Sequence, residues 1–338
     1  MSLSLANIIA ESLENLAYRE GVYGILLSGG VDSTFVALSM HGLGIIAITS
    51  VSGAKAPDLP FAKVVAERLG LEHVVAVPSL EEVERCMELA IRVAKSVDPV
   101  EIACDAALCV SLSKARELGV KKVATGDGGD ELFLGYSFLL EKNVEDLSKW
   151  LQWVVERAAF PSVPIGRELG VEVVPALFSS VAIAISKLVP IGDRVSRVGS
   201  VKVGKALLRR FLAFRGFPEV AIRNKTPVLV GSGFNSLVEA WREGMELSRA
   251  VGLCKKLGIA LPSRAHAYLA LFALERGIDV LALRLKGERS CPICGSALIG
   301  NSFCRFCGAY VNGNAITYHF RDELLDALKS SRRLRASM

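Results

Sequence analysis

Short apolar runs alternate with amphipathic segments over the first 136 residues. Four of these runs are predicted to be buried strands: Val22–Leu27, Leu43–Val51, His73–Val77 and Val120–Thr125. The amphipathic segments between them are predicted helices: Asp32–Met40, Leu59–Leu69, about 80–95 and about 104–118. Strands separated by helices of this length favour a doubly wound α/β fold, in which helices cover both faces of a parallel sheet. Ligands of such sheets bind beyond the carboxyl ends of the strands.

The rest of the chain divides into three further segments. After an α/β core at 1–136, residues 137–286 are predicted to be a mainly helical extension, interrupted by prolines and glycines. Residues 287–314 form a cysteine-glycine module, and residues 315–338 are a closing helix with a basic tail. The chain is therefore expected to hold an α/β core, a helical part, a small zinc ribbon and a C-terminal helix.

Composition adds few constraints. Apolar residues make up 51% and charged residues 22% of the chain, as in ordinary globular proteins, and the net charge of +5 does not require a polyanionic partner. The most apolar stretch, Val171–Ile191, contains Pro175, Lys187 and Pro190 and is predicted to be a buried helix rather than a membrane span. Residues 1–20 are predicted to be an amphipathic helix and not a signal peptide, so a cytoplasmic protein is expected.

The turn after the first predicted strand has the composition of a phosphate-binding loop. It reads Ser28-Gly29-Gly30-Val31-Asp32-Ser33. The glycines let the backbone approach an anion, and the start of the next helix presents N–H groups and a partial positive charge. Asp32 suits such a site if Mg²⁺ lies between its carboxylate and the phosphates. For the Ser-Gly-Gly core alone, an ordinary capped turn is the alternative interpretation.

A second glycine-rich turn, Thr125–Tyr136, follows the fourth predicted strand. It carries three carboxylates, Asp127, Asp130 and Glu131, within five residues. These groups repel one another and are stabilised best by a cation at the strand ends. A solvated acidic turn is the alternative if this segment is considered by itself.

Together the two turns resemble the signatures of a known family. The first has the form Ser-Gly-Gly-x-Asp-Ser of the PP-loop ATP pyrophosphatase superfamily. The second nearly reproduces Ser-Gly-Glu-Gly-x-Asp-Glu-x-Phe-x-Gly-Tyr, found in the synthetase domain of class B asparagine synthetases and in β-lactam synthetases. Three later segments are also similar to that family: Gly170–Pro175, Gly204–Arg209, and Pro218–Pro227 with Arg223 and Lys225. The resemblance covers residues 20–235.

The resemblance implies a ligase of amino-acid biosynthesis that converts ATP to AMP and pyrophosphate. A carboxylate would be activated as an acyl-adenylate and attacked by ammonia or an amine. The implied cofactors are ATP and Mg²⁺. The nucleotide-binding positions implied are Leu27, Val51, Thr125 and Gly126 near the adenosine, and Ser28, Gly29, Gly30 and Ser33 at the phosphates.

The same resemblance implies residues for the metal and the chemistry. Asp32 and Asp130 are the expected magnesium ligands, and Asp127 and Lys205 the expected catalytic residues. Asp127 stands where asparagine synthetases have a glutamate that is important for the acyl-adenylate. Lys205 matches a lysine that neutralises charge as the adenylate forms or breaks down.

The chain departs from the family pattern at positions that bear on its substrates. Ser2 occupies the place of the nucleophilic cysteine of the glutaminase domain, and the phosphate loop already begins at Ser28. Free ammonia, a separate ammonia-supplying subunit or another amine is therefore the expected nitrogen source. Asp127 is one methylene shorter than the family's glutamate, and Pro175–Phe178 replaces the family's Pro-Phe-Leu-Asp. The carboxylate substrate, aspartate or another small acid, is thus left open.

Four cysteines near the C-terminus have metal-ligand spacing. Cys291 and Cys294 form one Cys-x2-Cys-Gly knuckle, and Cys304 and Cys307 form a second. Four thiolates favour a tetrahedral structural Zn²⁺ site, so a zinc ribbon that could contact protein or RNA is predicted. Redox thiols, disulfides and iron are the alternatives.

Several other reactive side chains show no ligand spacing. Cys104 and Cys109 lie in an apolar predicted helix and are expected to be core thiols. Structural or exposed roles are expected for the four histidines: His41, His73, His266 and His319. Trp150 and Trp153 are predicted to pack between helices.

Two other functions compete with the amide ligase. One is a PP-loop tRNA-modifying enzyme of the thiolase type, which adenylates a base and often carries zinc ribbons. The other is a non-catalytic scaffold that binds ATP or a partner. The Asp-Glu-Leu-Phe-Leu-Gly-Tyr string from Asp130 to Tyr136 favours the amide-forming branch, and the presence of Asp32, Asp130 and Lys205 argues against the scaffold.

Overall fold

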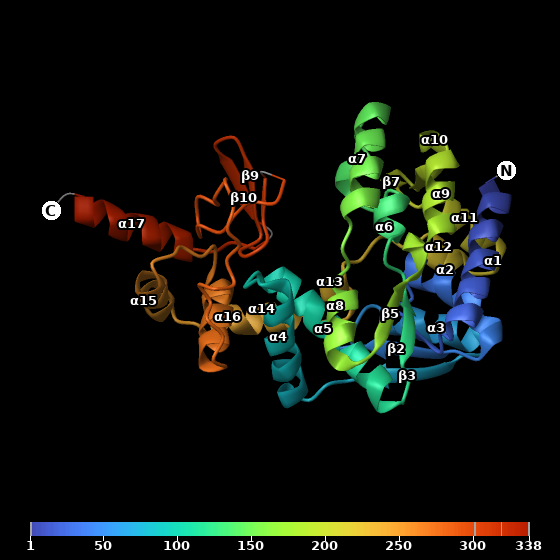
Figure 1. Cartoon of the computed structure of the whole chain (residues 1–338), viewed down its shortest axis with the longest axis horizontal. Coiled ribbons are helices and arrows are strands. Elements are labelled where there is room, and N and C mark those ends of the chain that lie inside the picture. The colour runs from blue at the N-terminus through green and yellow to red at the C-terminus, as the bar shows by residue number, and fades with distance from the viewer. Residues whose placement is uncertain (1, 301, 319, 337–338) are drawn as a thin grey trace. The chain divides into compact units, whose positions relative to one another are not determined.

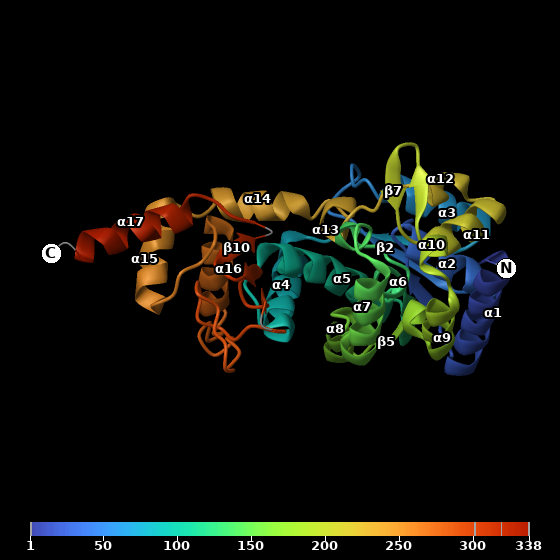
Figure 2. The ribbon, with the colours of Figure 1, turned by 90° about the horizontal axis from the view of Figure 1, so that it is seen from above.

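The computed structural model describes residues 2–300, 302–318 and 320–336. The chain forms two compact units, drawn in Figures 1 and 2. Unit 1 consists of residues 1–78 and 110–232, and unit 2 of residues 79–109 and 233–338. This division differs from the four consecutive segments expected from the sequence, because each unit is assembled from two separate stretches of chain.

Unit 1 is built on a five-stranded parallel sheet with the strand order β3-β2-β1-β4-β5. Its strands are β1 (Gly24–Leu26), β2 (Ile46–Ser50), β3 (Glu72–Ala76), β4 (Lys122–Thr125) and β5 (Glu172–Pro175). The order reverses at β1, the middle strand, and β4 pairs with it in parallel, so their carboxyl ends lie side by side. The predicted doubly wound α/β fold is confirmed, and the fifth strand extends it.

Three helices pack on one another beside this sheet in both views. They are α1 (Ser2–Glu20), α2 (Val31–Met40) and α11 (Ala206–Phe214). Their contact is apolar, and the rings of Phe35 and Phe211 lie 5.2 Å apart at its centre. α3 (Leu59–Leu69) connects β2 to β3 and ends at Gly70, whose φ of 63° suits a glycine at a helix end. The loop after β1 ends at the first residue of α2, and the loop after β2 ends at the first residue of α3. The packing of these two helices therefore sets the positions of both loops.

The remaining elements of unit 1 are short. They are α6 (Gly129–Leu132), α7 (Val144–Arg157), α8 (Ser162–Leu169), α9 (Ser180–Leu188), α10 (Ile191–Arg194), the hairpin β6–β7 (Ser196–Val198 and Val201–Val203), α12 (Pro218–Ala221), α13 (Val228–Gly231) and three 3-10 turns (His41–Leu43, Ser137–Leu139 and Ala176–Phe178). The prediction of one buried helix over Val171–Ile191 was wrong. That stretch starts as strand β5, because its first residues pair with β4, and only Ser180–Leu188 is α-helical.

Unit 2 combines a helical hairpin with a cysteine module. Its elements are α4 (Leu80–Ala94), α5 (Pro99–Glu117, which continues into unit 1), α14 (Asn235–Glu243), α15 (Leu247–Leu257), α16 (Arg264–Glu275), the three-stranded sheet β8–β10 (Phe303–Cys304, Ala309–Asn312 and Ala315–Tyr318) and α17 (Leu324–Ala336). Figures 1 and 2 show α4 beside α16, and Arg276 at the end of α16 binds Glu84 of α4 at 2.5 Å.

One cysteine prediction is corrected by this unit. Cys109 is not a free core thiol, since it forms a disulfide with Cys86 that joins α4 to α5. The two residues are 23 positions apart, and their Cα atoms come within 5.5 Å only because the two helices pack as a hairpin. Cys104 and Cys254 are not in disulfides. Among the described helices, none is long and apolar enough to span a bilayer.

Candidate active site

The turn between β1 and α2 is closed on itself by its two serines. The Ser28 and Ser33 hydroxyl oxygens are 3.0 Å apart, and the Gly30 amide lies 3.3 Å from the Ser28 hydroxyl. Gly29 has a φ of 67°, and a Cβ there would meet the backbone of Phe61 and Ala62 in the first turn of α3. Only glycine fits this left-handed position against another helix. The result is a compact anion-binding turn at the start of α2, with α3 at its back.

The second glycine-rich turn lies directly against the first. A Cβ on Gly126 would come within 2.8 Å of the Asp32 Cβ and 2.9 Å of the Ser33 amide nitrogen. The two turns are adjacent because β1 and β4 are neighbours in the sheet. Asp32 and Asp130 therefore face each other across the contact, as the sequence suggested they should if both bind one cation.

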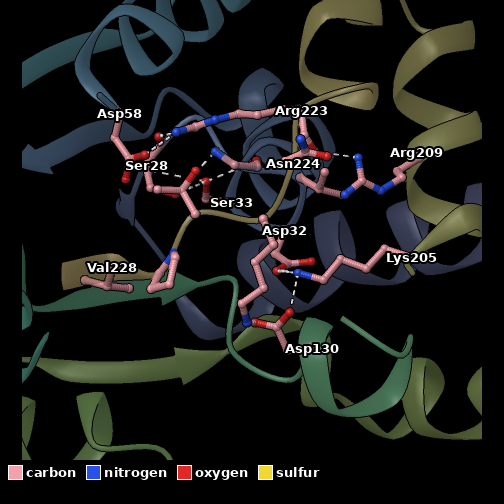
Figure 3. A pocket seen from close by; sticks show the side chains of 15 residues that line it. Ser28, Asp32, Ser33, Asp58, Asp130, Lys205, Arg209, Arg223, Asn224 and Val228 are labelled. Carbon is pink, nitrogen blue, oxygen red and sulfur yellow. Dashed lines mark hydrogen bonds and ion pairs between the residues drawn. The ribbon is translucent and has the colours of Figure 1, made fainter. Parts of the chain in front are cut away.

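Lys205 lies between these two carboxylates. Its ammonium group forms an ion pair with Asp32, and it is 2.7 Å from an Asp130 carboxylate oxygen (Figure 3). The ammonium group of Lys225 binds the other Asp130 oxygen at 2.5 Å. Lys205 is a non-glycine residue with a φ of 62°, and its amide donates to the Phe133 carbonyl at 2.7 Å. A strained lysine held against the second turn is typical of a functional position.

Burial and charge act against each other in this cluster. Burial raises the pKa of Asp32, although Lys205 opposes this effect. Burial also acts on Asp130, but Lys205 and Lys225 outweigh it and hold the pKa of Asp130 below its usual range. Burial would lower the pKa of Lys205, but Asp32 and Asp130 outweigh it and raise that pKa. The site thus keeps Lys205 charged and leaves Asp32 the carboxylate that gains most from another cation.

A cavity of about 270 Å³ opens over the two turns within unit 1. Its lining is described by Figure 3 and consists of Ser28, Gly30, Val31, Asp32, Ser33, Asp58, Asp130, Lys205, Arg209, Arg223, Asn224, Lys225, Thr226, Pro227 and Val228. Four of these residues are cationic and three are anionic. A pocket with this excess of positive charge, next to the N-terminus of α2, suits a polyanionic ligand such as a nucleotide phosphate.

The structure brings six of the predicted site residues to this cavity: Ser28, Gly30, Asp32, Ser33, Asp130 and Lys205. The other predicted positions support the turns from behind. Leu27 and Val51 are buried at the ends of β1 and β2, Gly29 packs on α3, and Thr125 and Gly126 lie at the end of β4. Roles for these residues toward an adenosine stay predictions.

Asp127 has different surroundings from Lys205, the other predicted catalytic residue. It is not among the residues lining the cavity. One of its oxygens accepts hydrogen bonds from the hydroxyls of Thr125, at 2.7 Å, and Ser162, at 2.5 Å. Burial raises the pKa of Asp127, against these hydrogen bonds. In this structure the Asp127 carboxylate joins the second turn to the start of α8.

Several residues that line the cavity were not among those predicted from the sequence. Asp58 and Asn224 carried no signal, because neither lies in a recognisable phosphate or metal motif. Arg209, Arg223 and Lys225 lay in segments similar to the family, but no role followed from that similarity. All five come from loops or short helices that reach the site only through the tertiary fold.

Two groups of side chains fit metal ions. Within the described chain, one Asp32 oxygen is buried without a hydrogen-bond partner, and one Asp130 oxygen has only its ion pair with Lys205. Oxygen ligands of this kind suit Mg²⁺. In unit 2 the sulfurs of Cys291, Cys294, Cys304 and Cys307 all lie within 4.8 Å of one another, and all four residues are buried. Four thiolates so placed suit a tetrahedral Zn²⁺.

The fold and the paired turns define an α/β protein of the PP-loop type, with its ligand site beyond the carboxyl ends of the sheet. The profile of the asparagine synthase family matches residues 4–186, more than half of the chain. The chain belongs to the asparagine synthase family, whose members use ATP to form amides.

The match to each individual relative covers only part of that relative's length. The putative asparagine synthetase (glutamine-hydrolyzing) 1 of Methanocaldococcus jannaschii is 34% identical over 135 residues, 38% of this chain and 24% of that protein. The root asparagine synthetase (glutamine-hydrolyzing) of Pisum sativum is 25% identical over 315 residues, 84% of this chain and 52% of the relative. The chain thus spans about a quarter to a half of the length of the curated relatives it matches.

A solved structure, the predicted subunit of a tRNA methyltransferase from Methanocaldococcus jannaschii, is 17% identical to this chain. The likeness covers 57% of this chain and 86% of that one with a TM-score of 0.29. A likeness this small carries no argument about fold or function.

Proposed function

We propose that this chain is an AMP- and pyrophosphate-forming amide ligase that activates a small carboxylic acid as an acyl-adenylate. Ammonia or another amine then attacks the adenylate, and the reaction takes place in the cytoplasm. The observation that carries the proposal is the meeting of the two turns, with Asp32, Asp130 and Lys205 in one cluster beside the Ser28–Ser33 turn.

The chain's own residues divide the work of adenylation. The backbone of the Ser28–Ser33 turn and the N-terminus of α2 bind the phosphates and orient the α-phosphorus toward the carboxylate. Lys205 and Lys225 supply positive charge where negative charge builds up as pyrophosphate leaves. A magnesium ion bound by Asp32 and Asp130 would neutralise further phosphate charge. AMP leaves in the second half-reaction, when the amine takes over the acyl group.

Asp127 is proposed to act at the nucleophile stage. Its buried carboxylate has a raised pKa, as a group that accepts a proton from an incoming amine needs. Because the hydroxyls of Thr125 and Ser162 hold this carboxylate, it would have to exchange one of these hydrogen bonds for the nucleophile. The nitrogen source proposed is free ammonia, an ammonia-supplying subunit or a small amine.

The four-cysteine cluster is proposed to bind one structural zinc ion. Closed four-thiolate sites of this type stabilise small sheets that have little hydrophobic core of their own. A protein or RNA partner for this module is part of the proposal, since its first residues include the exposed Arg289 and directly follow the exposed Lys286. Elemental analysis should give about one zinc per chain for the unsubstituted protein.

A pyrophosphate-release assay tests the function. The purified chain is incubated with ATP, Mg²⁺ and ammonium, and with aspartate or other small acids in turn. Release of pyrophosphate and AMP that depends on one acid supports the amide ligase. Release that depends only on tRNA would establish the thiolase-type alternative, and ATP binding without any AMP would establish the scaffold.

A further inference from the structure

Arg223 lies beside the phosphate-binding turn and makes three different contacts there. Its guanidinium forms an ion pair with Asp58, in the loop between β2 and α3 (Figure 3). It donates a long hydrogen bond of 3.4 Å to the Ser28 carbonyl, and it stacks over the Phe61 ring at 4.2 Å. The side chains of both Arg223 and Asp58 are 9% exposed. A planar cation that bonds at its edge and stacks on its face is fixed in one orientation.

Phe61 gives this arginine a second route to the turn. The Gly29 backbone packs so closely on Phe61 that a Cβ at Gly29 would be 2.6 Å from the Phe61 Cβ. The guanidinium therefore supports the turn directly at Ser28 and indirectly through the ring behind Gly29. Both contacts involve the segment whose amides are expected to face the phosphates.

The chain around Arg223 is itself held in place. The buried Arg209 guanidinium donates to the Arg223 carbonyl at 2.7 Å. Farther along, the Asp58 amide donates to the Gly231 carbonyl at 2.9 Å, and Gly231 lies against the Asp58 carboxylate, leaving no room for a Cβ. Asp58 thus contacts both Arg223 and the far end of the segment that forms this wall of the cavity.

From this geometry we propose that the Arg223–Asp58 pair is a positioning pair that sets the affinity for the triphosphate part of the nucleotide. It fixes the backbone of the phosphate-binding turn, and it keeps a buried carboxylate neutralised next to the phosphates. This inference rests on the proposed ATP site, and it assigns to Arg223 and Asp58 a role that the family motifs did not indicate.

Removing one partner has a different consequence from removing both. Arg223→Ala leaves Asp58 as an unpaired acid beside the phosphates, so it loses the support of the turn and adds repulsion. The double variant Arg223→Ala/Asp58→Asn loses the support but not the charge balance. Arg223→Lys keeps the charge but cannot pair, stack and reach Ser28 at once.

The experiment measures binding of Mg²⁺–ATP and of adenosine by titration calorimetry or competition. Arg223→Ala is expected to weaken ATP binding about tenfold or more, the size expected for charge-assisted hydrogen bonds, and to leave adenosine affinity within about twofold. The double variant and Arg223→Lys both keep the charge of Asp58 balanced, so each is expected to regain part of the loss, and neither is expected to reach the affinity of the unsubstituted protein. Thermal unfolding of each variant checks that it is folded, and Arg223→Lys and Asp58→Asn serve if Arg223→Ala is not.

Arg68 offers a matched control in the same unit. It pairs with Glu219 at 2.7 Å, donates to the Gly216 carbonyl and stacks over Phe217 at 5.0 Å, but it does not line the cavity. Arg68→Ala should leave ATP affinity unchanged. Unchanged ATP affinity in a folded Arg223 variant, or an equal loss for ATP and adenosine, would overturn the inference alone. Failure of the unsubstituted protein to bind ATP would overturn the proposed function as well.

Discussion

At the scale of single residues, the site depends on charges that satisfy one another. Asp32 and Asp130 are both largely buried and share Lys205, whose side chain is 7% exposed. Leaving such acids without a cation is costly, because their desolvation is no longer compensated. Either the Lys205 ammonium group or a divalent cation can therefore neutralise the two carboxylates.

Replacing Lys205 by methionine should reveal this exchange. Lys205→Met is expected to lower the free energy of unfolding by about 3 kcal/mol without Mg²⁺, since two buried carboxylates then repel each other. Mg²⁺ should restore part of that loss and should stabilise the variant more than the unsubstituted protein. Urea unfolding with and without Mg²⁺ measures both effects.

The control for this substitution is Lys149→Met, which removes an exposed ion pair with Glu145 and should change stability by about 0.5 kcal/mol or less. Equal Mg²⁺ responses of Lys205→Met and the unsubstituted protein would argue against a cation site between Asp32 and Asp130.

Two substitutions of Asp127 can distinguish a structural role of its carboxylate from a catalytic one. Asp127→Asn keeps an oxygen that can accept from Thr125 and Ser162, so its stability should stay within about 1 kcal/mol of the unsubstituted protein. Asp127→Ala removes the acceptor and should cost about 1–3 kcal/mol. If the carboxylate serves the nucleophile, Asp127→Asn should lower turnover at least about tenfold, with ATP affinity unchanged. Full turnover in Asp127→Asn would limit Asp127 to its structural bonds.

At the scale of secondary-structure elements, the cysteine module is attached to helices of unit 2. The Ser96 hydroxyl donates to the Arg305 carbonyl at 2.8 Å, and the Val97 amide to the Phe306 carbonyl at 2.9 Å. His266, buried at the start of α16, lies 3.3 Å from the Cys307 carbonyl. The second knuckle thus contacts both the loop between α4 and α5 and the start of α16.

Metal removal should therefore loosen this loop. Chelation of zinc, or Cys304→Ser, is expected to speed amide exchange over residues 96–101, because the carbonyls that Ser96 and Val97 contact belong to the knuckle. Exchange in β2 of unit 1 serves as the internal reference. Cys254→Ser, which removes a buried thiol outside the cluster, should leave exchange in the loop unchanged. A loop that stays protected without metal would show that the knuckle's backbone holds its shape without the ion.

Glu101 at the start of α5 should make stability depend on pH. Burial, opposed by Arg305, raises the pKa of Glu101 from 4.5 to about 7. Below pH 4.5 both states are protonated and nothing is lost. Between pH 4.5 and about 7 the unfolded state is ionised while the folded state keeps its proton, so folded stability falls over this range by up to about 3 kcal/mol and then stays level.

Glu101→Gln tests this sign. It should gain stability relative to the unsubstituted protein between pH 5 and pH 8, as measured by urea unfolding. The exposed Glu145→Gln is the control and should show no such trend. Parallel pH profiles for Glu101→Gln and the unsubstituted protein would contradict a raised pKa.

The secondary-structure elements differ in whether a local sequence pattern could predict them. Strands β1 to β4 and helices α2 and α3 were predicted from local hydrophobic periodicity and glycine signals, and the two turns from their motifs. β5 was missed because its apolar residues continue without a break into α9, and only pairing with β4 distinguishes the strand. Asp58, Asn224 and the Cys86–Cys109 disulfide depend on contacts between distant segments, which no local pattern records. His319 lies outside the described residues.

At the scale of the whole molecule, neither of the two units is a single continuous stretch of chain. Residues 79–109, the α4–α5 hairpin, leave unit 1 between β3 and β4 and complete unit 2 together with residues 233–338. The apolar face of α4 includes Val83, Met87 and Ile91, all buried. Residues 79–109 form one compact unit with residues 233–338, and Glu84 of α4 pairs with Arg276 at the end of α16, so the hairpin has its neighbours in a part of the chain that is far away in sequence.

A truncation after Ser232 should therefore fail to give a well-behaved unit 1. It would retain the hairpin but remove α14–α16, leaving the apolar face of α4 exposed and prone to aggregation. Replacing residues 79–109 in that truncation by a short glycine-serine linker should restore a monodisperse protein in size-exclusion chromatography. Equal behaviour of the two truncations would show that the hairpin is stable on its own.

The same chain order has a consequence during synthesis. The α4–α5 hairpin emerges from the ribosome before β4, β5 and the whole of α7–α13, and its partner helices come last. At ordinary translation rates it waits roughly ten seconds for them. During that interval Cys86 and Cys109 have both been synthesised, whereas the four clustered cysteines, Cys291, Cys294, Cys304 and Cys307, have not. An oxidant or a chaperone would therefore meet the disulfide pair before the cysteine cluster exists.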